Sequence, residues 1–70
     1  MNTQQYAITG YDVVDSHTQR VVKHNAVTAT TSAERCRKAA HRTADRLDAV
    51  YGAVRYVVRP CRVLVHPEAC

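Results

Sequence analysis

The first third of the chain alternates bulky apolar and polar residues in two stretches. The alternation from Gln4 to Asp15 changes phase at Gly10, and we expect a β-bulge there to bring the two halves onto one face. Ser16–Gln19 forms a polar turn, and Arg20–Thr30 is a second run rich in β-branched residues. The two stretches therefore predict an antiparallel hairpin.

The next segment has the three- and four-residue spacing of a helix. Thr31–Glu34 fits the capping-box pattern, in which the Thr31 hydroxyl accepts from a helical N–H and Glu34 reaches back to the cap. Gly52 provides the C-terminal stop. The apolar positions between them form one stripe: Ala33, Cys36, Ala40, Ala44, Leu47 and Tyr51. Because most of these residues are small, the helix axis can lie close to a sheet.

A third β-rich run, Ala53–Arg59, follows the helix. Pro60 lacks an N–H donor and is expected to interrupt the ladder. Residues 61–70 are expected to form a fourth strand or an arm with a loose C-terminal tail. Residues 1–70 are therefore predicted to be a single α+β domain, one helix packed on a three- or four-stranded antiparallel sheet in the order β-β-α-β(-β).

Composition limits what this domain can bury. The chain has 70 residues, of which 46% are hydrophobic, and it has neither Trp nor Phe. A chain of this length hides only ~60% of its unfolded surface, so a partner or a second copy would help to cover the open sheet face, and a homodimer is one expectation. The sequence shows no signal peptide and no apolar run near the ~18 residues that span a bilayer, which favours a cytoplasmic protein without membrane contact.

Positive charge is the most organised polar feature. The formal net charge is +4, and four basic residues follow one side of the predicted helix at spacings of three, four and four. We call Arg35, Lys38, Arg42 and Arg46 the cationic row. Glu34 and Asp45 are spaced to pair with Lys38 and Arg42 within the helix. A second positive stripe is expected on the last strand, and the predicted contact residues for a partner or a nucleic acid are Arg35, Lys38, Arg42, Arg46, Arg55 and Arg59.

Signals for catalysis are weak. The chain has no glycine-rich phosphate loop and no recognised catalytic motif. Cys36 or Cys61 could pair with one of four histidines, but Cys36 lies in the apolar stripe, where a thiol is usually inert packing. Cys61, His66 and Cys70 place metal-binding side chains within ten residues, and a fourth ligand could come from His17, His24 or His41. The spacing matches no common zinc pattern. We therefore expect no enzyme activity, no cofactor and no metal.

The segment Arg37–Tyr56 carries the pattern DRLD-x-x-YGA-x-RY after a predicted hairpin. It resembles small uncharacterised phage and prophage proteins. That resemblance implies a stoichiometric inhibitor of host defence, of the anti-CRISPR kind, which covers a nucleic-acid-binding surface or a subunit interface. Many anti-CRISPR proteins are acidic mimics of DNA, whereas this chain is basic. The resemblance, taken with the basic charge, leaves two mechanisms in the host cytoplasm: docking on an acidic patch of a host protein, or bringing positive charge to a nucleoprotein complex. It supplies no active-site residues.

Two functional hypotheses follow. In the first, the chain is a non-enzymatic binding protein of phage type that acts on a host complex through the cationic row and the last strand. In the second, the same residues bind nucleic acid directly and with little sequence specificity. Tyr6, Tyr11, Tyr51 and Tyr56 would then be available for base stacking, although Tyr51 and Tyr56 are expected to face the core.

Overall fold

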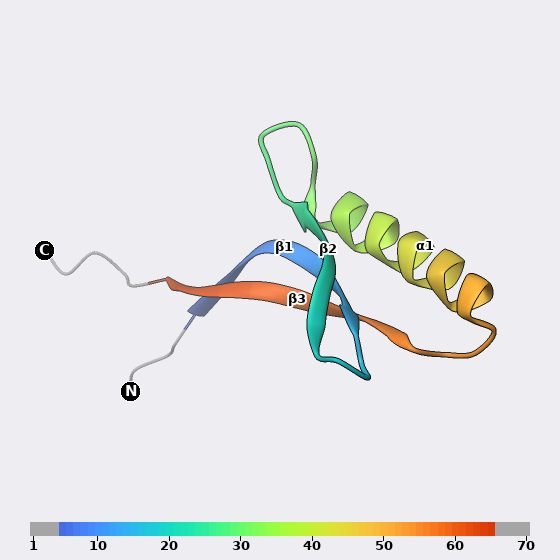
Figure 1. Cartoon of the computed structure of the whole chain (residues 1–70). Helices are drawn as coiled ribbons and strands as arrows, with labels where there is room; N and C mark the ends of the chain where they lie inside the picture. Colours follow the sequence, from blue (N-terminus) through green and yellow to red (C-terminus); the bar gives the residue numbers. More distant parts are fainter. Residues whose placement is uncertain (1–4, 66–70) are drawn as a thin grey trace, which may run out of the picture.

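The computed structural model describes residues 5–65, which form three antiparallel strands and one helix. Strand β1 spans Gln5–Asp15, β2 spans Arg20–Ala26, α1 spans Ala33–Tyr51 and β3 spans Tyr56–Val65. The strands lie in the order β2-β1-β3, with β1 in the centre. Figure 1 shows α1 packed across one face of this sheet. The predicted α+β fold and its β-β-α-β order are confirmed.

The pairing of β1 with β3 shows the predicted bulge. Ile8 lies opposite Arg62 and Gly10 lies opposite Cys61, so Thr9 is the extra residue on β1. The extra residue restores the phase of the alternation, and the apolar residues before and after it face the same side of the sheet. Beyond the end of β2, the paired ends of β1 and β3 continue as a two-stranded arm (Figure 1).

Strand β3 is continuous through Pro60, so the expected break in the ladder is wrong. Pro60 lies opposite Tyr11. Because β3 is an edge strand, every second N–H points away from β1, and a residue without a donor fits such a position. Residues 61–65 extend β3 and do not form a separate strand, and the expected tail, residues 66–70, lies outside the described residues.

Two expected boundaries near the helix also need correction. Strand β2 ends at Ala26, not Thr30, because the chain turns: the Thr28 hydroxyl accepts from the N–H groups of Thr30 and Thr31 at 3.3 and 3.1 Å. The helix cap is Ser32, whose hydroxyl accepts from the N–H of Arg35 at 3.2 Å. The predicted capping box built on Thr31 is therefore wrong by one position.

The C-terminal stop of the helix is as predicted. Gly52 has a φ of 92°, and its N–H donates to the carbonyl of Asp48 at 2.8 Å. The Asp48 carboxylate then accepts from the N–H groups of Arg55 and Tyr56 at 2.9 and 2.8 Å. One aspartate thus connects the last turn of α1 to the start of β3.

The core lies between α1 and the sheet and is small. Its fully or nearly buried apolar side chains are Val13, Val14, Cys36, Ala40 and Ala44. Leu47, Tyr56 and Val58 are partly buried against it. Tyr51 differs from the expectation, because it is 48% exposed at the end of the stripe. Within residues 5–65, no helix has both the length and the apolar character needed to cross a bilayer.

Candidate functional site

The cationic row lies on the side of α1 that faces away from the sheet. All four of its residues are exposed, whereas Cys36, Ala40 and Ala44 on the inner side are buried. The 3.6-residue period of the helix produces this separation, because positions three and four apart fall on one face. The row therefore presents its positive groups to solvent along more than two turns.

Little negative charge compensates the row. Lys38 pairs with Glu34 at 3.6 Å, but both side chains are more than 60% exposed, and such surface pairs contribute little. The expected pair between Arg42 and Asp45 does not form. Among the described residues, the guanidinium groups of Arg35, Arg42 and Arg46 make no ion pair. These three groups are therefore free to bind an anionic partner.

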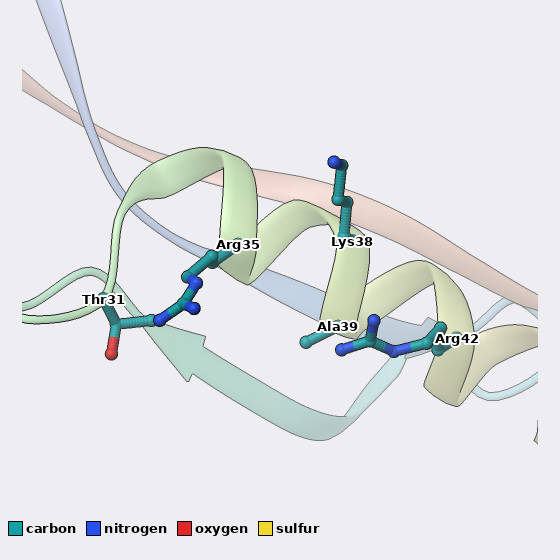
Figure 2. Close-up of a pocket in the computed structure, with 5 residues that line it drawn as sticks. All are labelled: Thr31, Arg35, Lys38, Ala39 and Arg42. Carbon is teal, nitrogen blue, oxygen red and sulfur yellow. The ribbon is translucent and has the colours of Figure 1, made fainter.

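A shallow pocket lies within the row. It is lined by Thr31, Arg35, Lys38, Ala39 and Arg42. Figure 2 shows that the side chain of Arg42 extends beside Ala39, that Arg35 points toward Thr31, and that Lys38 points away from both. The small side chain of Ala39 leaves space between the two arginines. Carboxylate and phosphate groups are the ligands that such guanidinium groups bind most strongly.

Arg55, the fifth predicted contact residue, is occupied within the fold. Its Nε and Nη2 atoms donate to the two carboxylate oxygens of Asp15 at 2.8 and 2.7 Å. Hydrogen bonding to Arg55 holds the pKa of Asp15 well below its ordinary value, and the same contact raises the pKa of Arg55. The guanidinium also lies 4.7 Å from the ring centre of Tyr51. Arg55 therefore organises structure and is not part of the exposed row.

Arg59, the sixth predicted contact residue, lies on the other face of the sheet. Its neighbour Val58 packs against the core under α1, and adjacent strand residues point to opposite faces. Arg59 is exposed and donates to the Gln19 side chain at 3.3 Å. The structure thus brings four of the six predicted residues together and separates the other two from them.

Exposed apolar side chains adjoin the C-terminal end of the row. Val50 and Val54 are 83% and 84% exposed, and Tyr51 lies between them in sequence. Val50 follows Arg46 by four residues and so lies one helical turn beyond it. Neither valine is among the contact residues that the sequence predicts. The signal that identifies Val50 is its position outside the apolar stripe, where a large aliphatic residue has nothing to pack against.

The described cysteines differ in their surroundings. Cys36 is buried, and its thiol donates to the carbonyl of Ala26 at 3.2 Å, which agrees with inert packing. Cys61 is partly exposed and lies near His24, with 3.9 Å between Sγ and Nδ1. Asp12 completes this group and is not among the metal-binding residues that the sequence suggests. His66 and Cys70, the other residues of the metal hypothesis, lie outside the described residues.

Comparison of the chain with protein-family models, with curated proteins and with solved structures gives no match. The surface of α1 therefore has to be interpreted from its own chemistry. That chemistry combines a solvent-facing row of basic side chains with an apolar end, on a helix that is fixed to the sheet by its opposite side.

Proposed function

We propose that the protein is a non-enzymatic binding protein whose outer α1 surface docks on an acidic patch of a protein partner. The observation that carries this proposal is the uncompensated charge of Arg35, Arg42 and Arg46 on an exposed helix face. Arginine forms paired hydrogen bonds with carboxylates and is enriched at the centres of protein interfaces. The face is also rigid, because small residues hold the other side of α1 close to the sheet.

The apolar end of the row favours a protein over a phosphate backbone. Val50 and Val54 offer aliphatic surface that a nucleic-acid backbone does not use, and Tyr51 is half exposed beside them. Protein interfaces typically combine an apolar centre with arginine and tyrosine and a polar rim. The partner expected from this combination has carboxylates opposite the row and an apolar patch opposite the valines.

Within this class, the proposed role is that of a phage-type protein that inhibits a host defence nucleoprotein stoichiometrically in the host cytoplasm. The resemblance of residues 37–56 supports this role, as do the size and basic charge of the chain. Positive charge argues against imitation of a DNA backbone. It is compatible with covering an acidic subunit surface or with approaching nucleic acid that the complex already holds.

Direct nucleic-acid binding is the second candidate function, and the spacing of the cationic row favours it. One helical turn advances ~5.4 Å, so the four heads of the row, those of Arg35, Lys38, Arg42 and Arg46, can follow successive phosphates of one strand. Contacts to about four phosphates of duplex DNA predict a log–log salt slope of about −3 to −4. A protein that docks on an acidic protein patch does not bind an isolated duplex in this way.

Affinity capture from a bacterial lysate, with and without nuclease, tests the proposal. The double variant R42E/R46E reverses two charges of the row, and the control R20E/R62E reverses two exposed arginines outside α1. The proposal expects a captured protein that survives nuclease treatment, is lost with R42E/R46E and is retained with R20E/R62E. Capture that disappears after nuclease, together with a gel shift of duplex DNA at ~50 mM salt, establishes the second candidate instead. Capture that R42E/R46E leaves unchanged contradicts the role of the helix face.

A further inference from the structure

Each strand of the sheet contributes one metal-binding side chain to a single cluster on the face opposite α1. The three residues are Asp12 of β1, His24 of β2 and Cys61 of β3. Asp12 lies opposite His24 in the ladder, while Cys61 lies opposite Gly10, two residues from Asp12 on the same face. The carboxylate oxygen, ring nitrogen and sulfur atoms all lie within 4.8 Å of one another.

The contacts of His24 distinguish a metal site from a catalytic relay. In a Cys-His-Asp relay, the thiol and the carboxylate contact different nitrogens of the imidazole ring. Here Asp12 Oδ1 lies 2.5 Å from Nδ1 of His24, and Cys61 Sγ lies 3.9 Å from the same nitrogen. The carboxylate and the sulfur therefore gather around one ring nitrogen, and the three donor atoms form a single group of the kind that surrounds an ion.

Gly10 makes the cluster sterically possible. A Cβ atom at this position would lie 2.9 Å from Cε1 of His24 and 2.6 Å from the carbonyl oxygen of Asn25. Any larger residue would displace the imidazole ring or strand β2, next to Cys61, which pairs with Gly10 across the sheet. The glycine thus provides the space in which the histidine and cysteine side chains approach each other.

The carboxylate of Asp12 makes no ion pair with the arginine that lies opposite it in the sheet. Arg59 lies opposite Asp12 in the β1–β3 ladder, which is a favourable position for an ion pair. Its guanidinium instead donates to Gln19 at 3.3 Å, and Asp12 contacts His24. Asp12 is therefore directed at the histidine and cysteine and not at the neighbouring arginine.

We propose that Asp12, His24 and Cys61 bind a divalent transition-metal ion, with zinc the best match to one oxygen, one nitrogen and one sulfur ligand. Tetrahedral zinc holds its oxygen, nitrogen and sulfur ligands ~3.3–3.5 Å apart, so the 2.5 Å contact between Asp12 and His24 has to open and Cys61 has to move closer, by about 1 Å each, to complete the site. The thiol releases one proton to solvent on binding, and the imidazole proton resides on Nε2. Because His24 is half exposed, water supplies the fourth ligand.

A metal at this position would join all three strands. Asp12 is on the central strand, and His24 and Cys61 are on the two edge strands. One ion would therefore cross-link the sheet, as disulfide bonds do in other small domains. The buried core contains mostly small side chains, which makes such a link valuable to the fold. The site is independent of the cationic row, which lies beyond the other face of the sheet.

Titration of the full-length, metal-stripped and reduced chain with zinc and with cobalt tests the proposal. We expect one ion per chain, a rise in the midpoint of thermal unfolding with zinc, and, with cobalt, a thiolate charge-transfer band and the strong visible bands of a tetrahedral site. The variants C61S, H24Q and D12N should each weaken zinc binding at least ~10-fold, since even residues behind the ligands contribute 10–100-fold. H24Q should also abolish the zinc-dependent thermal shift.

Two controls exclude other ligands. The variant H41Q removes an exposed histidine of α1, and H66Q/C70S removes the metal-binding side chains near the C-terminus; both should retain full zinc affinity. Circular dichroism establishes that each variant is folded, and the cobalt spectrum of the unaltered chain tests the thiolate ligand without any substitution. Absence of stoichiometric binding overturns the proposal. Equal affinity of the chain and of C61S overturns it as well, as does loss of binding in H66Q/C70S alone.

Discussion

Arg55 and Asp15 are joined by two parallel hydrogen bonds of 2.8 and 2.7 Å, which connect the end of β1 to the segment before β3. The same carboxylate accepts from the N–H of His17 at 2.9 Å and so shapes the turn between β1 and β2. Asp15 is 6% exposed, and Tyr51 lies against the guanidinium. One ion pair thus holds the hairpin turn, the end of α1 and the start of β3 together.

The first prediction concerns the shape of this ion pair. The variant R55K keeps the positive charge but loses the planar fork that bonds both oxygens, so we expect a lower midpoint of thermal unfolding. The matched variant R59K changes an exposed arginine of β3, the strand that begins directly after Arg55, and should leave the midpoint nearly unchanged. Equal midpoints for R55K and R59K would show that the charge alone is sufficient.

The second prediction concerns acid. The folded-state pKa of Asp15 lies below its unfolded value of about 3.9, because Arg55 and backbone N–H groups stabilise the carboxylate. The stabilisation is therefore complete above pH ~4 and is lost as the pH falls from there through the folded-state pKa. Urea unfolding between pH 7 and pH 2 should show this decline. The variant D15N should be less stable at pH 7, and its free energy of unfolding should fall less as the pH decreases. A parallel decline in D15N would assign the acid sensitivity to other carboxylates.

The third prediction identifies the helix cap. Removing the hydroxyl in S32A leaves the N–H of Arg35 without its partner and should lower the free energy of unfolding by about 1 kcal/mol. The neighbouring variant T31A should change it by less than ~0.5 kcal/mol, because the Thr31 hydroxyl caps no helical N–H. Chemical denaturation of the two variants measures the difference. A larger effect of T31A would restore the capping box that the sequence predicts.

The fourth prediction compares the two glycines. In G10A the new methyl group meets the Asn25 carbonyl oxygen at 2.6 Å, and moving β2 should cost about 1–3 kcal/mol. In G52A the methyl group enters open space, but the φ of 92° is strained, which costs about 1 kcal/mol. Denaturation should therefore rank G10A as the less stable variant, and the reverse order would mean that β2 shifts easily.

Local patterns were sufficient to predict most of the fold. The change in the apolar–polar alternation at Gly10 predicted the bulge. Without an extra residue there, the apolar side chains before and after Gly10 would face opposite sides of a sheet that has only one buried face. Gly52 and the alanine-rich stripe likewise predicted the end and the inner side of α1. Pro60 was misinterpreted because the tolerance for proline depends on whether a strand is central or at an edge, and a single sequence does not contain that information.

The positions of His24 and Arg55 depend on tertiary contacts. Strands β1 and β2 begin their pairing with Asp15 opposite Arg20. If the pairing continued residue by residue without a bulge, Lys23 would lie opposite Asp12. A second irregularity, between Val13 and Val14, shifts the register by one residue and brings His24 there instead. Arg55 fits an exposed stripe by alternation, but it precedes β3 and turns to Asp15, so its ion pair could not be predicted from spacing.

Pro60 also affects how copies of this protein can associate. The outer rim of an edge strand normally offers a row of N–H groups to which another extended chain can attach, and fibril growth begins in this way. On β3, Pro60 removes one of these N–H groups near the middle of the strand. The exposed cations Arg59 and Arg62 lie on either side of the missing N–H. Elongation of the sheet into a filament is thereby blocked on the β3 side, and strand-by-strand recruitment is confined to β2.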